Sequence, residues 1–357
     1  MSVWKALRTI AKRCNMTEKT NIIRLGFVGD VCLADNYTPV IALDEIGSTD
    51  VSDGVDARFI RLMHDMNLMW ANNEFCYSDR GERMLKKQFA FRAKTANVRY
   101  LADLGVNVAG LANNHVFDYG EQAFLDTLET LEGAGIPSVG AGRDLAAAQA
   151  PVYLQAGGLT VAYVAASRAE KVRMTPEATD TTPGILLCYD NSRFIASIRE
   201  ASAHADYVVA LPHWGTERTT DLEDAQTHGA RAYIDAGADA VIGTHAHCLQ
   251  GIEFYEGKPI LYNLGNFWFD GFKGLTALAE LQLPLAAGDS GRAGRDGQGG
   301  RGVDPSGVRL VLYPGWQQMA ITSWVDNPED RANAFRYIEH ISVNATIDEA
   351  GIVQQAG

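Results

Sequence analysis

The chain has 357 residues, of which 46% are hydrophobic and 21% charged, proportions typical of a soluble globular enzyme with a large core. With 31 basic against 44 acidic residues the net charge is −13. This charge argues against a nucleic-acid backbone as partner, because phosphate binding requires clustered Lys and Arg. The five cysteines are odd in number and form no CxxC pair, which disfavours a disulfide framework and favours a reducing, cytoplasmic location.

The N-terminal segment, residues 1–21, is basic and mildly amphipathic, and we expect a helix or tail. It lacks the continuous apolar region of a secretory signal. A short helix packed on the domain is favoured over a helix lying on a membrane surface. No membrane span is expected, because no later stretch approaches the roughly 18 apolar residues that a span needs.

From residue 22 onward, short apolar runs alternate with segments of helical period. This alternation predicts an α/β protein whose sheets are covered by helices. Strands are expected at 22–28, 106–111, 159–165, 207–211, 240–242 and 259–264. Helices are expected at 57–68, 96–104, 121–131, 191–204 and 225–236.

The C-terminal third interrupts this pattern. Residues 286–307 are dominated by Gly, Arg and Asp and predict a flexible loop. A phosphate-cradling loop is the alternative, which lacks the strand-to-helix context such loops have. Strands are expected within 307–325, a helix at 328–340 and a tail at 343–357.

Two carboxylates follow predicted strands. Asp30 comes directly after Gly29 at the end of the first strand, where α/β sheets gather their ligands. Glu74 follows the apolar run 68–70 and offers a second carboxylate, able to bridge two cations. Taken singly, Asp30 is equally typical of a helix or turn cap, and Glu74 of a surface acid.

A third motif contains Asn113, Asn114, His115 and Asp118. The carbonyl oxygen of an Asn can ligate a metal, which leaves His115 free to act on a substrate. Asp118, three residues on, can orient His115. The alternative is an Asn-rich helix cap with a structural histidine.

Three histidines complete the pattern. His213 closes a predicted strand, and His245 and His247 follow Gly243. Histidines two apart in extended backbone point to opposite faces, so both can bind metal only if the backbone turns, for which Gly243 gives freedom. Jointly the strand-end motifs supply Asp, Glu, Asn and three His. That set suits two divalent ions such as Mn, Zn or Fe, about 3.5–4 Å apart.

The motifs resemble, in order and spacing from about residue 22 to 285, the CapA family of capsule (poly-γ-glutamate) synthesis proteins, a branch of the calcineurin-like metallophosphoesterases. The segments that carry the resemblance are 29–31, 73–74, 111–120, 213–217, 235–251 and 262–270. The fold it implies is a four-layer αββα sandwich of two mixed β-sheets, with one domain at 22–342.

The resemblance also implies roles for site residues. Asp30 and His247 would bind one metal ion, Asn114, His213 and His245 the other, and Glu74 would bridge them. His115, oriented by Asp118, would protonate the leaving group or stabilise charge on the transferred group. Asn113, Glu217 and Asn266 would contact substrate or support the ligands.

The implied activity is hydrolysis of a phosphate ester or amide-type bond through a metal-bound hydroxide, on a small-molecule or peptide-like substrate. The alternative is a capsule or secondary-metabolite biosynthesis protein, whose metal site assists amide-bond formation or release with an ATP-dependent ligase partner. A non-catalytic scaffold is disfavoured, because an unused cluster of acids costs stability through like-charge repulsion.

Overall fold

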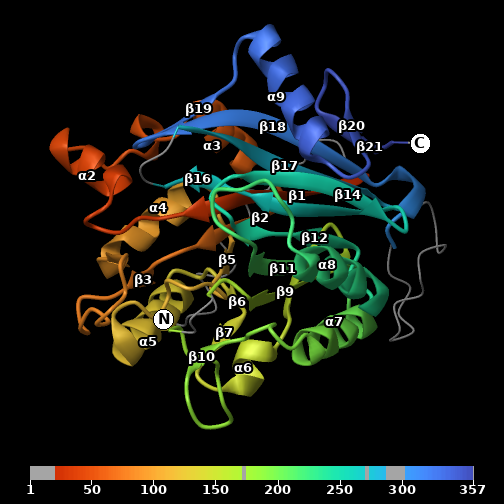
Figure 1. Cartoon of the computed structure of the whole chain (residues 1–357). Coiled ribbons are helices and arrows are strands. Elements are labelled where there is room, and N and C mark those ends of the chain that lie inside the picture. The colour runs from red at the N-terminus through yellow and green to blue at the C-terminus, as the bar shows by residue number, and fades with distance from the viewer. Residues whose placement is uncertain (1–20, 171–173, 270–272, 287–301, 357) are drawn as a thin grey trace, which may run out of the picture.

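The computed structural model describes residues 21–170, 174–269, 273–286 and 302–356, and two mixed sheets form its centre (Figure 1). The larger sheet has ten strands among the described residues; the half from β1 to β6 is parallel and the half from β17 to β20 is antiparallel. In order these strands are β20 (Ala345–Ile347), β21 (Ile352–Gln355), β18 (Arg309–Gln318), β17 (Gly274–Pro284), β1 (Ile22–Val31), β2 (Leu68–Asn73), β5 (Val108–Gly110) and β6 (Ser138–Val139), with β16 (Asn266–Trp268) on β1 and β19 (Ile321–Trp324) on β18.

The second sheet has seven strands in the described part of the chain. In order they are β14 (Leu249–Tyr255), β15 (Lys258–Leu264), β12 (Ala240–Ile242), β11 (Tyr207–Trp214), β9 (Leu159–Ser167) and β8 (Val152–Ala156), with β13 (Thr244–His245) on β11. The strands from β15 to β9 are parallel, and β14 and β8 flank them in antiparallel orientation.

Helices cover the outer faces of both sheets, and one further helix, α9 (Pro328–Ile341), closes the layer between them with Phe335 and Ile338. The outer helices are α2 (Thr38–Glu45), α3 (Ala57–His64), α4 (Val98–Asp103) and α5 (Gly120–Gly133) beside the larger sheet, and α6 (Leu145–Gln149), α7 (Ser192–His204) and α8 (Asp224–Ala236) beside the smaller one, while α9 packs against β14, β18 and β20. Short paired segments are β3 (Cys76–Tyr77) with β4 (Arg92–Ala93) and β7 (Ala141–Gly142) with β10 (Gly184–Ile185). Single 3-10 turns lie at Val51–Asp53, Thr95–Asn97 and Pro305–Gly307.

Three apolar clusters separate the layers. Alternation along each strand sends successive side chains to opposite faces. Phe27 of β1 and Tyr163 of β9 therefore meet between the sheets, with ring centroids 6.4 Å apart. Val28 packs instead beneath α4, and Val164 beneath α7 and α8. Three cores between four layers confirm the predicted αββα sandwich.

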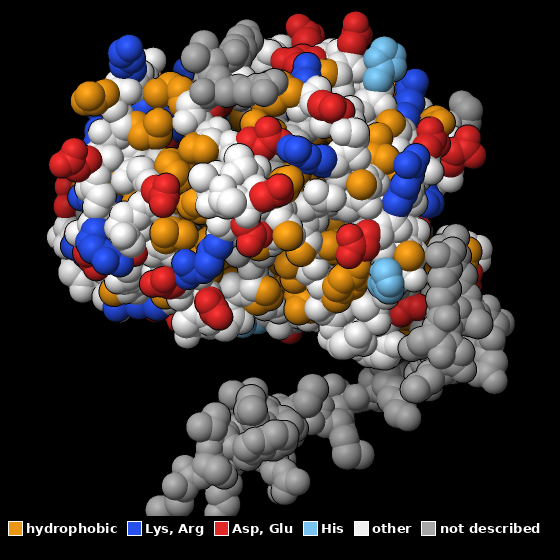
Figure 2. All heavy atoms as spheres, turned by 90° about the horizontal axis from the view of Figure 1, so that it is seen from below, with side chains coloured by type: hydrophobic (Ala, Val, Ile, Leu, Met, Phe, Trp, Pro, Cys, Tyr) orange, Lys and Arg blue, Asp and Glu red, His pale blue; other side chains and the backbone are white. Residues whose placement is uncertain are grey.

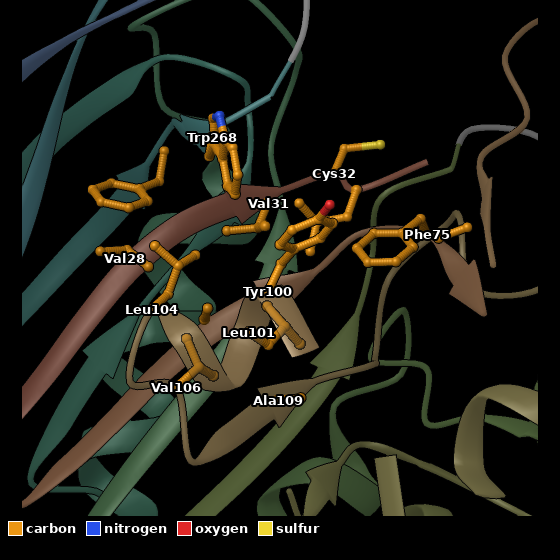
Figure 3. Close-up of a cluster of buried hydrophobic side chains, with 14 of the residues drawn as sticks. Val28, Val31, Cys32, Phe75, Tyr100, Leu101, Leu104, Val106, Ala109 and Trp268 are labelled. Carbon is orange, nitrogen blue, oxygen red and sulfur yellow. The ribbon is translucent and has the colours of Figure 1, made fainter. Parts of the chain in front are cut away.

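The cluster beneath α4 fixes the end of β1. Figure 3 shows Leu104, directly after α4, beside Val28 of β1, and Tyr100 of α4 beside Val31, in a cluster that also contains Trp268 of β16. All of these side chains are 0–1% exposed, and each such burial stabilises the fold by about 1.5–3 kcal/mol. Asp30, two residues after Val28, is thereby held at the rim of a rigid layer.

Two expected boundaries are wrong. The helix expected at 57–68 ends at His64. Asn67 donates its backbone N–H to the Arg24 carbonyl oxygen and accepts the Arg24 N–H at its Oδ1, and β2 begins at the next residue. The tail expected at 343–357 instead contains β20 and β21, and β21 pairs with β18 and buries Val353. Residues 1–20, and 287–301 of the expected loop at 286–307, lie outside the described part of the chain.

Candidate metal centre

The residues predicted as metal ligands meet where parallel strands of both sheets end. Asp30 lies at the end of β1 and Glu74 directly after β2. His213 lies near the end of β11, beside β13, which contains His245. All six predicted ligands, Asp30, Glu74, Asn114, His213, His245 and His247, lie in this one region and are buried or nearly so.

Close backbone packing fixes the position of Asp30. A Cβ atom on Gly29 would lie 1.8 Å from the carbonyl oxygen of Gly265, so only glycine fits there. The register of β1 against β2 shifts between Val28 and Asp30, which re-aims the carboxylate. Asp30 then pairs with Asn72 of β2 on one side and Asn266 of β16 on the other.

The carboxylates and imidazoles fall into two groups that share Glu74. One contains Glu74, His213 and His245, and the other Asp30, Glu74 and His247. Within each group, one candidate ligand atom per residue lies within 4.8 Å of the others. Such groups are compatible with bound metal ions. Asn114 adjoins the first group, with its Oδ1 2.8 Å from Nε2 of His213.

Glu74 carries a buried oxygen that accepts no hydrogen bond from the described residues. This Oε1 lies 3.8 Å from Nε2 of His213, 3.9 Å from that of His247 and 4.0 Å from that of His115. Burial, followed by the charge of Asp30, raises the pKa of Glu74 well above its usual range. An unpaired carboxylate oxygen surrounded by imidazoles fits a cation, which would remove this penalty.

The histidines of the first group are neutral, as metal ligands must be. Burial, together with the neighbouring His247, lowers the pKa of His245 to about 3. Burial and His245 likewise hold the pKa of His213 well below its usual range. Nδ1 of His245 has no hydrogen-bond partner among the described residues, and Nδ1 of His213 lies 2.9 Å from the Thr244 hydroxyl. Both side chains therefore fit a divalent metal.

The backbone turn that brings His245 and His247 together lies at the histidines themselves. Their φ angles are 101° and 55°, in the left-handed region that non-glycine residues rarely adopt. The expectation that Gly243 supplies this freedom is wrong, because Gly243 serves close packing. A Cβ atom there would lie 2.0 Å from the Tyr262 carbonyl oxygen. Strain of about 1–3 kcal/mol per residue is typical of functional sites.

His247 belongs to the second group. Its Nδ1 lies 2.7 Å from Oδ1 of Asn266 and 3.5 Å from Oδ2 of Asp30. Burial opposes a charge on the imidazole, but the interactions with Asp30 and Asn266 outweigh burial and raise the pKa of His247. A metal ion bound at this imidazole would therefore have to displace a proton more readily retained than usual.

His115 and Asp118 form a hydrogen-bonded pair beside the two groups. Nδ1 of His115 lies 2.7 Å from Oδ2 of Asp118, which also accepts the Phe91 backbone N–H at 2.7 Å. The Phe91 ring packs on the imidazole with centroids 4.2 Å apart. Burial lowers the pKa of His115, although Asp118 opposes this. Nε2 of His115 faces Glu74.

The other three predicted residues lie in different surroundings. Asn113 is fully buried, accepts the backbone N–H of His115 and donates to the Asn73 carbonyl, so it shapes the loop. Asn266 holds His247. Glu217 is exposed, and its charge raises the pKa of both Glu74 and His247, which places it near the centre.

Two residues of the site were missed from the sequence. The Asn72 amide donates to Asp30 at 2.8 Å and to Glu74 at 3.3 Å, so one side chain holds both carboxylates. Strand alternation gave a signal, since Asn72 lies two positions before Glu74 and on the same face. Lys87 forms an ion pair with Asp118 at 2.5 Å, and nothing in its local sequence indicates this.

The described residues thus form a four-layer sandwich of two mixed sheets, with carboxylates and imidazoles gathered at the strand ends where the sheets meet. The family model of the bacterial capsule synthesis protein PGA_cap matches residues 24–271, and the chain belongs to this family. The resemblance to CapA proteins is thereby confirmed.

Similar proteins include the PGA biosynthesis protein CapA of Bacillus subtilis, 33% identical over 77% of this chain and 71% of that protein. A probable polyglutamine synthesis accessory protein of Mycobacterium tuberculosis is 34% identical over 55% of this chain and 53% of its own length. Among solved structures, a putative 5'-nucleotidase from Staphylococcus aureus has 14% identity and a TM-score of 0.46, covering 89% of this chain and 58% of that one. A phosphatase from Mycoplasma pneumoniae has 12% identity and a TM-score of 0.44, covering 74% and 89%.

The expectations about membrane spans, cysteines and surface charge can also be compared with the structure. Within the described ranges, no helix has the length and apolar character needed to cross a bilayer. Among the described residues, Cys32, Cys76, Cys188 and Cys248 form no disulfide, and Cys14 lies outside the described residues. On the face drawn in Figure 2, Lys and Arg side chains are interspersed with Asp and Glu.

Proposed function

We propose that this protein is a hydrolase with two divalent metal ions, Mn, Zn or Fe, that acts on a phosphate ester or an amide-type bond. In this proposal Asp30 and His247 hold one ion, while His213 and His245 hold the other together with Asn114. Glu74 bridges the two. The observation that carries the proposal is the position of Glu74, which both ligand groups share and whose unpaired Oε1 lies 3.8 Å from Nε2 of His213 and 3.9 Å from Nε2 of His247.

A bound pair of divalent ions would polarise the scissile group and activate water for attack. The chain's own residues then handle the proton. Nε2 of His115 faces the centre, and Nδ1 donates to Asp118. Because the Asp118 charge favours the imidazolium form, His115 can take up a proton at Nε2 and deliver it to the leaving group. Burial keeps His115 neutral until that step.

A second candidate function follows from the names of the relatives. One is a PGA biosynthesis protein and another a probable polyglutamine synthesis accessory protein. Under this candidate the same centre assists amide-bond formation or release of a peptide-like polymer beside an ATP-dependent ligase. Because such a ligase consumes ATP, this function would be cytoplasmic.

Metal-dependent hydrolysis of bis(p-nitrophenyl) phosphate by the full chain tests the first candidate. We expect His245→Ala to abolish turnover. The control, His340→Ala, removes an exposed imidazole of α9 and should leave turnover unchanged. Bound metal without hydrolysis, and activity only when an ATP-dependent ligase is added, would favour the second candidate. A wild-type chain that binds no divalent metal would contradict both.

A further inference from the structure

Lys87 is a buried cation in the loop between β3 and β4, and its residue is 8% exposed. Its ammonium lies 2.5 Å from Oδ1 of Asp118 and 3.5 Å from Oε1 of Glu170, and it donates to the Asn114 carbonyl oxygen. Lysine is almost never buried unless it is paired. The three acceptors belong to two separate segments, so Lys87 ties both of them to its own loop.

The contact with Asp118 fixes the orientation of His115. Oδ2 of Asp118 accepts from His115 and from the Phe91 N–H, while Oδ1 faces Lys87. Both carboxylate oxygens are therefore occupied, and rotation of the carboxylate would break an ion pair. Because an ionised carboxylate can only accept, Nδ1 of His115 is held as the donor. Nε2 is thereby directed toward Glu74.

The contact with Asn114 acts on the neighbouring side chain. The Asn114 carbonyl oxygen accepts from Lys87 and, at 2.9 Å, from the Thr175 hydroxyl. Glu170 in turn accepts the backbone N–H of Thr175 at 2.8 Å. This network holds the peptide unit between Asn114 and His115. The Asn114 side chain contacts His213, and the His115 side chain faces Glu74.

We propose that Lys87 is a positioning residue that fixes Asn114 and the His115–Asp118 pair relative to the metal centre. The proposal rests on the proposed function, because it assigns Lys87 a role through His115. Lys87 contacts none of the side-chain atoms proposed to bind metal, because it reaches the backbone of Asn114 and the side chains of Asp118 and Glu170.

The test compares Lys87→Gln and Lys87→Met with Lys94→Gln in the full chain. Lys94 is an exposed lysine close to the same loop and serves as the matched control. The primary measurement is the imidazole ¹⁵N–¹H spectrum of protein labelled at histidine, with His115→Gln assigning the Nδ1–H signal. The spectrum is recorded before and after chelation, so it reports on His115 independently of metal and of hydrolysis.

We expect the His115 Nδ1–H signal to move or broaden in both Lys87 variants and to stay in place in Lys94→Gln. In hydrolysis of bis(p-nitrophenyl) phosphate, kcat should fall about 10- to 100-fold with little change in KM, as is typical when a supporting partner is lost. An unchanged Nδ1–H signal in folded Lys87 variants would overturn the proposal. Loss of fold in both variants would also overturn it, since Lys87 would then serve the fold. A wild type without hydrolysis would contradict the proposed function and leave the spectroscopic test intact.

Discussion

The backbone N–H of His245 donates to Oδ2 of Asp30 at 3.3 Å, although 215 positions separate the two residues. Asp30 belongs to the larger sheet and His245 to the smaller one. Since Asn72 occupies the other oxygen of Asp30, this carboxylate ties the two sheets together at their strand ends. The candidate metal centre is therefore built where the two sheets touch.

Glu74→Gln should have opposite effects on the metal-free and the metal-loaded protein. Without metal, burial and Asp30 disfavour the ionised form of Glu74 and raise its pKa, so replacing the carboxyl by a neutral amide should raise the free energy of unfolding at pH 7 by about 1–3 kcal/mol. With metal, loss of the bridging carboxylate should release bound ions. Urea unfolding with and without chelator measures both effects.

Glu253→Gln is the matched control, because Glu253 is also buried but accepts from Arg231 at 2.8 Å and from Tyr262 at 2.5 Å. This substitution should destabilise the protein whether or not metal is present. A metal-free Glu74→Gln protein that is less stable than wild type would contradict the proposed electrostatic penalty at Glu74.

His247→Ala should remove one metal ion and leave the other. His247 belongs only to the group with Asp30 and Glu74, whereas His213 and His245 complete the other group. Elemental analysis should show the metal-to-protein ratio falling from about 2 to about 1, while circular dichroism stays unchanged. An unaltered ratio would remove His247 from the ligand set.

His115→Ala should keep both ions and slow turnover by about two to four orders of magnitude, the range for general acid–base catalysis. The imidazole of His115 hydrogen-bonds to Asp118, and its Nε2 lies 4.0 Å from Oε1 of Glu74. His204→Ala, which removes an exposed imidazole of α7, is the control. Near-normal hydrolysis by His115→Ala would exclude the catalytic role.

Glu280 makes stability depend on pH at a distance from the site. Its carboxylate is fully buried and accepts from Arg24 at 2.5 Å and from Tyr313 at 2.7 Å. Burial alone would raise its pKa, but these hydrogen bonds outweigh burial and lower the pKa below 4.5. The ionised Glu280 carboxylate therefore stabilises the fold above its unfolded-state pKa, and this stabilisation is lost as pH falls through its folded-state pKa.

Glu280→Gln should accordingly destabilise the protein by about 1–3 kcal/mol at pH 7, and the difference from wild type should shrink below about pH 4. Urea unfolding across this range measures the difference. Glu45→Gln, at an exposed position of α2, should show little effect at either pH. A difference for Glu280→Gln that grows on acidification would contradict the assigned direction.

Strand alternation and strand-end position made much of the fold and the site predictable. Both depend only on local sequence, which is why β1 and β11 and the meeting of Asp30 with His213 could be foreseen. The C-terminal pair β20 and β21 could not, because these strands have three and four residues and bury one side chain each, which leaves no alternating pattern to recognise.

Features that depend on tertiary context were beyond sequence reasoning. Lys87 reaches Asp118 from a loop without periodic structure, so its neighbours in the chain do not indicate the contact. The left-handed backbone at His245 and His247 was not predicted, because non-glycine residues adopt it rarely and nothing in the local sequence marks these two positions. Both features lie at the site, where local rules most often fail.

The most direct test is an anomalous difference map from crystals of the full chain grown with Mn²⁺. Two peaks are expected, one among Asp30, Glu74 and His247 and the other among Glu74, His213 and His245. Absence of any peak between these side chains, in crystals where Mn²⁺ is in excess, would contradict the claim that the two sheets build a shared metal centre.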